Sequence, residues 1–81
     1  MTRTKPVSYM DMALAQARDA ASRGEVPVGA VIVRDGEIIA KAGNRTRELN
    51  DPTAHAEMLV IREAAKALQS ERLAGCDLYV T

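Results

Sequence analysis

The sequence has 81 residues, one cysteine, no Trp or Phe, and 11 basic side chains balanced by 11 acidic ones. That length suits one small domain, and the formal net charge of zero gives no support for nucleic-acid binding through bulk electrostatics. A single cysteine excludes an internal disulfide, and the absence of a long apolar run or of a signal-peptide core leads us to expect a cytoplasmic protein without a membrane span.

The N-terminal part predicts a short tail followed by a helix. Residues 1–7 are polar and are expected to form a flexible tail. Ser8 and Asp11 have the spacing of a capping box, so a helix is predicted over Tyr9–Arg23. Its expected buried stripe is rich in small residues that permit close packing on a sheet: Met10, Ala13, Leu14, Ala17 and Ala21.

A β-hairpin is predicted next. Val26–Val33 is nearly continuous apolar sequence, which favours a strand covered on both faces. Asp35-Gly36 is typical of a two-residue hairpin turn, and Glu37–Ala42 would return as the antiparallel partner. Gly43–Asn50 is then expected to be a solvated polar loop.

A second helix is predicted over Pro52–Gln69. Asp51 can cap its first N–H groups, and Pro52 suits the first helical position because its missing N–H costs nothing there. His55 would then lie in the first turn. The expected apolar stripe consists of Ala54, Met58, Ile61, Ala65 and Leu68.

The last predicted element is a strand over Leu78–Thr81, reached through a connector at Ser70–Asp77. The order α-β-β-α-β is the opening of a three-layer α/β/α domain. We expect the third strand to run parallel to the first, with an outer edge that has no partner.

His55 and Glu57 are the strongest candidates for chemistry. In the first turn of a helix, side chains tilt toward the N-terminus, so both groups can converge on a point just beyond the helix end. A metal ion with its bound water could occupy that point. Taken alone, His-x-Glu is too common to exclude a structural or surface histidine.

Four segments together resemble a known family. They are Glu25–Val31, Gly43–Arg45, Asn50–Glu57 and Leu78–Thr81. In order and spacing they are similar to bacterial tRNA adenosine deaminases of the cytidine deaminase superfamily. The resemblance implies a cytidine-deaminase-like α/β/α fold, with residues 8–81 as the N-terminal half of a zinc-dependent deaminase domain.

The resemblance also implies roles for individual residues. His55 would be a zinc ligand, Glu57 the catalytic proton shuttle, Asn44 a hydrogen-bonding partner of the purine, and Val26 part of the pocket wall. The implied reaction converts adenosine to inosine at the wobble position of the tRNA anticodon arm. The implied cofactor is one Zn²⁺, and the implied assembly is a homodimer.

The family's second motif, Pro-Cys-x-x-Cys, does not occur within these 81 residues and is expected just beyond Thr81. Cys76 lacks that context and is expected to pack as a small apolar residue near the third strand. The chain alone is therefore expected neither to hold zinc tightly nor to deaminate anything. Two alternatives stay open: a guanine or other purine deaminase of the same superfamily, and a non-catalytic fragment. Arg45 and Arg47 are candidate phosphate contacts.

Overall fold

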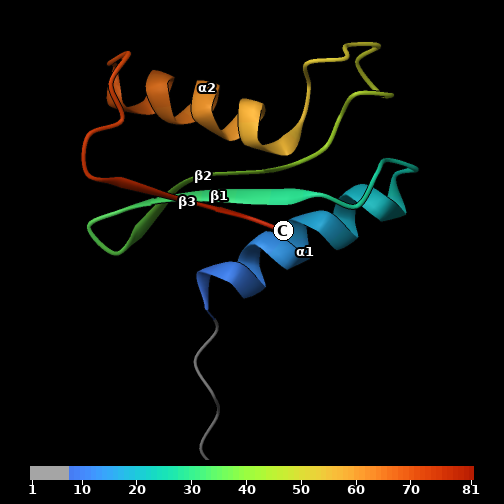
Figure 1. The fold of residues 1–81 in the computed structure, drawn as a ribbon, viewed down its shortest axis with the longest axis horizontal. Helices are drawn as coiled ribbons and strands as arrows, with labels where there is room; N and C mark the ends of the chain where they lie inside the picture. The colour runs from blue at the N-terminus through green and yellow to red at the C-terminus, as the bar shows by residue number, and fades with distance from the viewer. Residues whose placement is uncertain (1–7) are drawn as a thin grey trace, which may run out of the picture.

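A computed structural model describes residues 8–81, so the predicted tail at residues 1–7 lies outside the described residues. The elements follow the predicted order: α1 (Tyr9–Ser22), β1 (Gly29–Arg34), β2 (Glu37–Gly43), α2 (Ala56–Leu68) and β3 (Cys76–Val80). The strands form one sheet in the order β2-β1-β3, and α1 and α2 cover its opposite faces (Figure 1). The predicted three-layer α/β/α arrangement is confirmed.

The central strand β1 supplies both halves of the core. Ala30 and Ile32 pack with α2, whereas Val31 and Val33 pack with α1. Successive side chains of a strand point to opposite faces, so this strand is apolar along its length because both faces are covered. The prediction of a strand buried on both sides is correct, although the strand begins at Gly29 rather than Val26.

α1 matches its predicted range to within one residue, whereas α2 begins four residues after the predicted Pro52. In both helices the buried face differs from the predicted one. In α1 the capping box of Ser8 and Asp11 is present, and the buried residues are Ala13, Ala17 and Ala20. In α2 the buried residues are Ala56, Val60 and Ala64. Several members of the predicted stripes are instead exposed: Met10, Leu14, Ala21, Met58 and Ile61. Apolar side chains cover much of the circumference of both helices, so their periodicity could not identify the sheet-facing side.

Close packing of α1 on the sheet depends on two glycines that are register partners in β1 and β2. Gly29 lies opposite Gly43. A Cβ at Gly29 would lie 2.1 Å from the carbonyl oxygen of Ala13, and one at Gly43 would lie 2.6 Å from that of Gln16. The glycines therefore form the surface on which the α1 backbone rests.

The predicted direction of the third strand is wrong. β3 pairs with β1 in the antiparallel sense, from Ala30 opposite Val80 to Arg34 opposite Cys76. A helical crossover preserves the direction of the strand that precedes it. That strand is β2, which runs opposite to β1, so β3 is parallel to β2 and antiparallel to its neighbour. β3 is nevertheless at the sheet edge, as predicted, and Cys76 packs against the core from it.

Candidate active site

The N-terminus of α2 is formed by a turn that the sequence did not predict. Asp51 Oδ1 accepts hydrogen bonds from the Thr53 backbone N–H at 2.8 Å and from the Thr53 hydroxyl at 2.7 Å. These bonds, the hydroxyl first, lower the pKa of Asp51. The Ala54 N–H donates to the Asp51 carbonyl oxygen. Asp51 therefore closes a turn over residues 51–54 instead of capping the helix.

His55 is consequently the N-cap residue of α2 and not part of its first turn, which corrects the prediction. Its backbone is extended, with φ −75° and ψ 151°, and its side chain makes no capping hydrogen bond. His55 is exposed. Its imidazole is thus available to an external ligand at the end of the helix where the backbone N–H groups point outward.

Glu57 lies in the first turn of α2 and is half-buried. Its Oε1 atom is buried and has no hydrogen-bond partner among residues 8–81. Buried polar atoms are nearly always hydrogen-bonded, because an unpaired one costs about 1–3 kcal/mol. An acceptor of this kind beside an exposed histidine indicates a place where a bound group or a proton would be accommodated.

Asn44 holds the same end of the helix from the opposite side of the loop. It is 2% exposed. Its Oδ1 accepts the backbone N–H of Ala56 at 2.8 Å, and its own N–H donates to the Val28 carbonyl oxygen at 3.0 Å. Asn44 thus supplies the capping acceptor that His55 does not provide. The amide NH₂ group remains as a donor in the same side chain.

Val26 lies near this region but is not buried in it. It precedes β1 and is 49% exposed. The Val28 N–H donates to the Val26 carbonyl oxygen at 2.8 Å around Pro27, a tight turn that delays the start of the strand to Gly29. Hydrogen bonds thus connect Val26 to Val28, and Val28 to Asn44.

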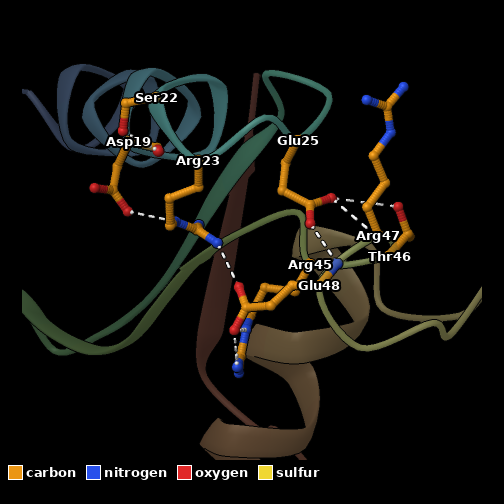
Figure 2. A network of polar contacts seen from close by, with 8 residues as sticks. All are labelled: Asp19, Ser22, Arg23, Glu25, Arg45, Thr46, Arg47 and Glu48. Atoms are coloured by element: carbon orange, nitrogen blue, oxygen red, sulfur yellow. Dashed lines mark hydrogen bonds and ion pairs between the residues drawn. The ribbon is translucent and has the colours of Figure 1, made fainter.

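A polar network fixes the loop that joins β2 to α2 (Figure 2). Glu25 accepts the backbone N–H groups of Arg47 and Glu48 and lies 3.5 Å from the Thr46 hydroxyl. The Glu48 carboxylate in turn binds Arg23 at 2.8 Å and Arg45 at 2.6 Å. Arg45 is therefore neutralised by Glu48, whereas the Arg47 guanidinium donates to the Gly24 carbonyl oxygen.

The network shifts the pKa values of Glu25, Arg45 and Glu48. Burial raises the pKa of Glu25, but the N–H groups of Glu48 and Arg47 and the nearby Arg23 charge outweigh it and leave that pKa lowered. The hydrogen bond from Arg45 lowers the pKa of Glu48 and raises that of Arg45. Sequence reasoning assigned no role to Glu25. The available signal in the sequence is an acidic residue directly before the apolar run Val26–Val33.

The described residues supply only part of a metal site. No group of three or more His, Cys, Asp or Glu side chains in residues 8–81 is placed to hold a metal ion. Cys76 pairs with Arg34, the last residue of β1. Asn44 follows Gly43, which pairs with Gly29, the first residue of β1. Cys76 therefore lies at the other end of the sheet from Asn44 and cannot share a metal ion with His55. The exposed imidazole of His55 and the unpaired Oε1 of Glu57, two residues apart at the start of α2, fit part of a zinc site.

The cavity beside β2 does not include the predicted site residues. It has a volume of about 410 Å³ and lies beside the free edge of β2. Its walls include Arg23, Arg45 and Glu48, which are already paired with one another.

Among the described residues, no helix is long and apolar enough to cross a membrane.

Comparison with known proteins gives consistent matches. Residues 3–81 match the family model for the cytidine and deoxycytidylate deaminase zinc-binding region. The chain is 64% identical over 73 residues to a tRNA-specific adenosine deaminase from Agrobacterium fabrum, covering 90% of this chain and 48% of that protein. The chain thus spans about half the length of that relative.

Solved structures agree with the sequence matches. A structure from studies of A-to-I editing by tRNA:A34 deaminases superposes with a TM-score of 0.87 at 64% identity, covering 90% of this chain and 56% of that one. Guanine deaminase from Bacillus subtilis also superposes with a TM-score of 0.87, at 41% identity, covering 95% of this chain and 50% of the other.

Proposed function

The chain belongs to the cytidine and deoxycytidylate deaminase family, and we propose that it is the N-terminal half of a zinc-dependent tRNA adenosine deaminase. In this proposal residues 8–81 belong to a deaminase domain that converts adenosine to inosine at the wobble position of the anticodon arm. The tRNA-specific deaminase from Agrobacterium fabrum supports this substrate through its 64% identity.

The observation that carries the proposal is the environment of Glu57. A carboxylate oxygen that is buried without a partner is costly for stability, so a functional role is a more economical explanation than a structural one. It lies in the first turn of the same helix that has the exposed His55 as N-cap. That pairing suits a general acid–base group beside a metal ligand.

Each site residue then has a defined task. His55 would hold the zinc ion through a ring nitrogen, together with two cysteines expected beyond Thr81. Thr81 is hydrogen-bonded to Gly29, so those cysteines would follow from the end of the sheet that carries Asn44. When bound, zinc supplies hydroxide at neutral pH by lowering the pKa of its water to about 7.

Glu57 would move the protons of the reaction. It would take a proton from the attacking water and pass it to the adenine ring nitrogen as the bond from oxygen to C6 forms. It would then take the proton of the new C6 hydroxyl and deliver it to the amine, which leaves as ammonia when the C6–N bond breaks, giving inosine. The Asn44 NH₂ group would donate to the purine, because its oxygen is occupied by Ala56. The exposed Val26 would form part of the pocket wall. We further propose a homodimer that acts in the cytoplasm, where its tRNA substrate is found.

A purine-base deaminase is the second candidate. The Bacillus subtilis guanine deaminase superposes as well as the tRNA deaminase structure does, although its identity is lower, at 41% against 64%. The shared fold therefore supports deamination more strongly than it supports a particular substrate. A non-catalytic fragment is the third candidate.

The deciding experiment assays the complete protein on an anticodon stem-loop with adenosine at the wobble position and, separately, on free guanine. Inosine formation that stops with a zinc chelator supports the proposal, and release of ammonia from guanine alone would refute it. Glu57→Gln should lower the rate by about 10²-fold or more while the protein stays folded. A variant that kept full activity would remove Glu57 from the chemistry.

A further inference from the structure

Glu25 is a buried acid that the proposed reaction does not use. Its side chain follows α1 and precedes β1, and the residue is 6% exposed. Buried carboxylates need hydrogen-bond partners, and those of Glu25 all belong to three consecutive residues, 46–48, more than twenty positions along the chain. Figure 2 shows the carboxylate pointing into this segment.

The contacted segment is a helical turn, and Glu25 occupies its capping position. The Leu49 N–H donates to the Arg45 carbonyl oxygen at 3.0 Å, the spacing of an α-turn. Its preceding N–H groups have no acceptor within the turn. Glu25 Oε2 accepts the Glu48 N–H at 2.7 Å, and Oε1 accepts the Arg47 N–H at 3.2 Å. One carboxylate thereby satisfies two backbone donors.

This turn is connected directly to the candidate site. The Asp51 N–H donates to the Thr46 carbonyl oxygen, and the Arg45 N–H donates to the Ala54 carbonyl oxygen at 2.9 Å. The loop is thus closed at its base. Asn44 leaves one side of that base and His55 leaves the other, and the Asn44 oxygen bridges them through the Ala56 N–H.

From these contacts we propose that Glu25 is a positioning residue whose carboxylate fixes the turn at residues 46–48 and so sets Asn44 against the N-terminus of α2. It acts through the loop and touches no reacting atom. The geometry requires both oxygens, because glutamine would keep one acceptor and point its NH₂ group at the other backbone N–H. Aspartate is one methylene shorter and reaches fewer of the donors.

Hydrogen exchange on the complete protein tests this without reference to activity. In Glu25→Gln, the amides of Arg47, Glu48 and Ala56 should exchange about tenfold faster or more. The reason is that a backbone hydrogen bond to residue 25 is lost at the turn and the bond from Ala56 to Asn44 is lost at the start of α2. Amides of the core strand β1, such as those of Val31 and Val33, should keep their protection.

Glu48→Gln is the matched control. It weakens the exposed ion pairs with Arg23 and Arg45 but leaves the backbone N–H that Glu25 accepts, so Ala56 should remain protected. The proposal is overturned if Ala56 stays protected in Glu25→Gln while the turn exchanges faster. It is equally overturned if β1 and Ala56 accelerate together, which would indicate general destabilisation. If Glu25→Gln does not fold, Glu25→Asp provides the same comparison.

The catalytic consequence rests on the proposed function and is measured separately. In Glu25→Gln, kcat/KM for the anticodon stem-loop should fall about tenfold or more, because small misplacements of a site are costly. Unchanged kcat/KM in a variant whose Ala56 amide is deprotected would contradict the positioning role. Absence of deaminase activity in the unmodified protein would refute the proposed function, and the exchange measurement would still decide the role of Glu25.

Discussion

The Asn44 side-chain oxygen accepts the backbone N–H of Ala56 at 2.8 Å, and Ala56 lies between the two residues proposed to carry the chemistry. His55 precedes it as the N-cap, and Glu57 follows it in the first turn. A loop residue therefore fixes the helix end that presents both groups. In the proposed function the same side chain would also donate its NH₂ group to the purine.

Substitutions at Asn44 should separate these two tasks. Asn44→Ala removes a buried hydrogen bond and should lower the free energy of unfolding by about 2 kcal/mol. Asn44→Asp keeps an oxygen for Ala56, and its negative charge faces a helix N-terminus, so it should lose less stability. Both should lose substrate affinity. Urea denaturation and KM measurements would check this, and equal stability of the two variants would contradict the capping role.

Gly29 should be intolerant of any side chain. A Cβ there would lie 2.1 Å from the Ala13 carbonyl oxygen and 2.5 Å from the Ala17 backbone nitrogen, so α1 would have to move away from the sheet. Gly29→Ala should cost about 3 kcal/mol. Gly24 is the control, because it has open space around it and a φ of +82°, and Gly24→Ala should cost about 1 kcal/mol of backbone strain. Thermal unfolding of both variants would show whether Gly29→Ala lowers stability more than Gly24→Ala does.

Local signals in the sequence predicted part of this molecule well. Asp35 and Gly36 have φ values of +51° and +77°, as the hairpin signal required, and the Ser8–Asp11 capping box is present. These features depend on neighbouring residues. The direction of β3 depends on which strand the crossover follows, and the buried helix faces depend on the shape of the sheet.

The candidate site shows the same difference between features set by neighbouring residues and features set by distant ones. His55 and Glu57 lie at the start of α2, but Asp51 binds Thr53 rather than capping the helix, which moves the helix start to Ala56. The cap comes from Asn44, twelve positions earlier, and the loop is held by Glu25. Contacts between segments this far apart leave no periodic pattern in a single sequence.

Stability should fall in acid through the loop carboxylates. The pKa values of Glu25 and Glu48 are lowered from their ordinary value of 4.5. A carboxylate with a lowered folded-state pKa adds stability above its unfolded pKa, and that stability is lost as the pH falls through the folded value. The free energy of unfolding should therefore decrease below about pH 4.5. Glu25→Gln should make this decrease shallower, and an unchanged pH profile in that variant would contradict the assignment.

Zinc retention should depend on ligands outside residues 1–81. His55, the N-cap of α2, is the ligand proposed within this chain, and no cluster of three potential ligands occurs among residues 8–81. Because a zinc site normally needs three protein ligands plus water, residues 1–81 produced alone should lose zinc on dialysis against a chelator. The complete protein should retain about one equivalent, and His55→Ala should abolish that retention. Metal analysis after dialysis decides the matter: one equivalent of zinc bound to residues 1–81 alone would show that this chain holds a complete site.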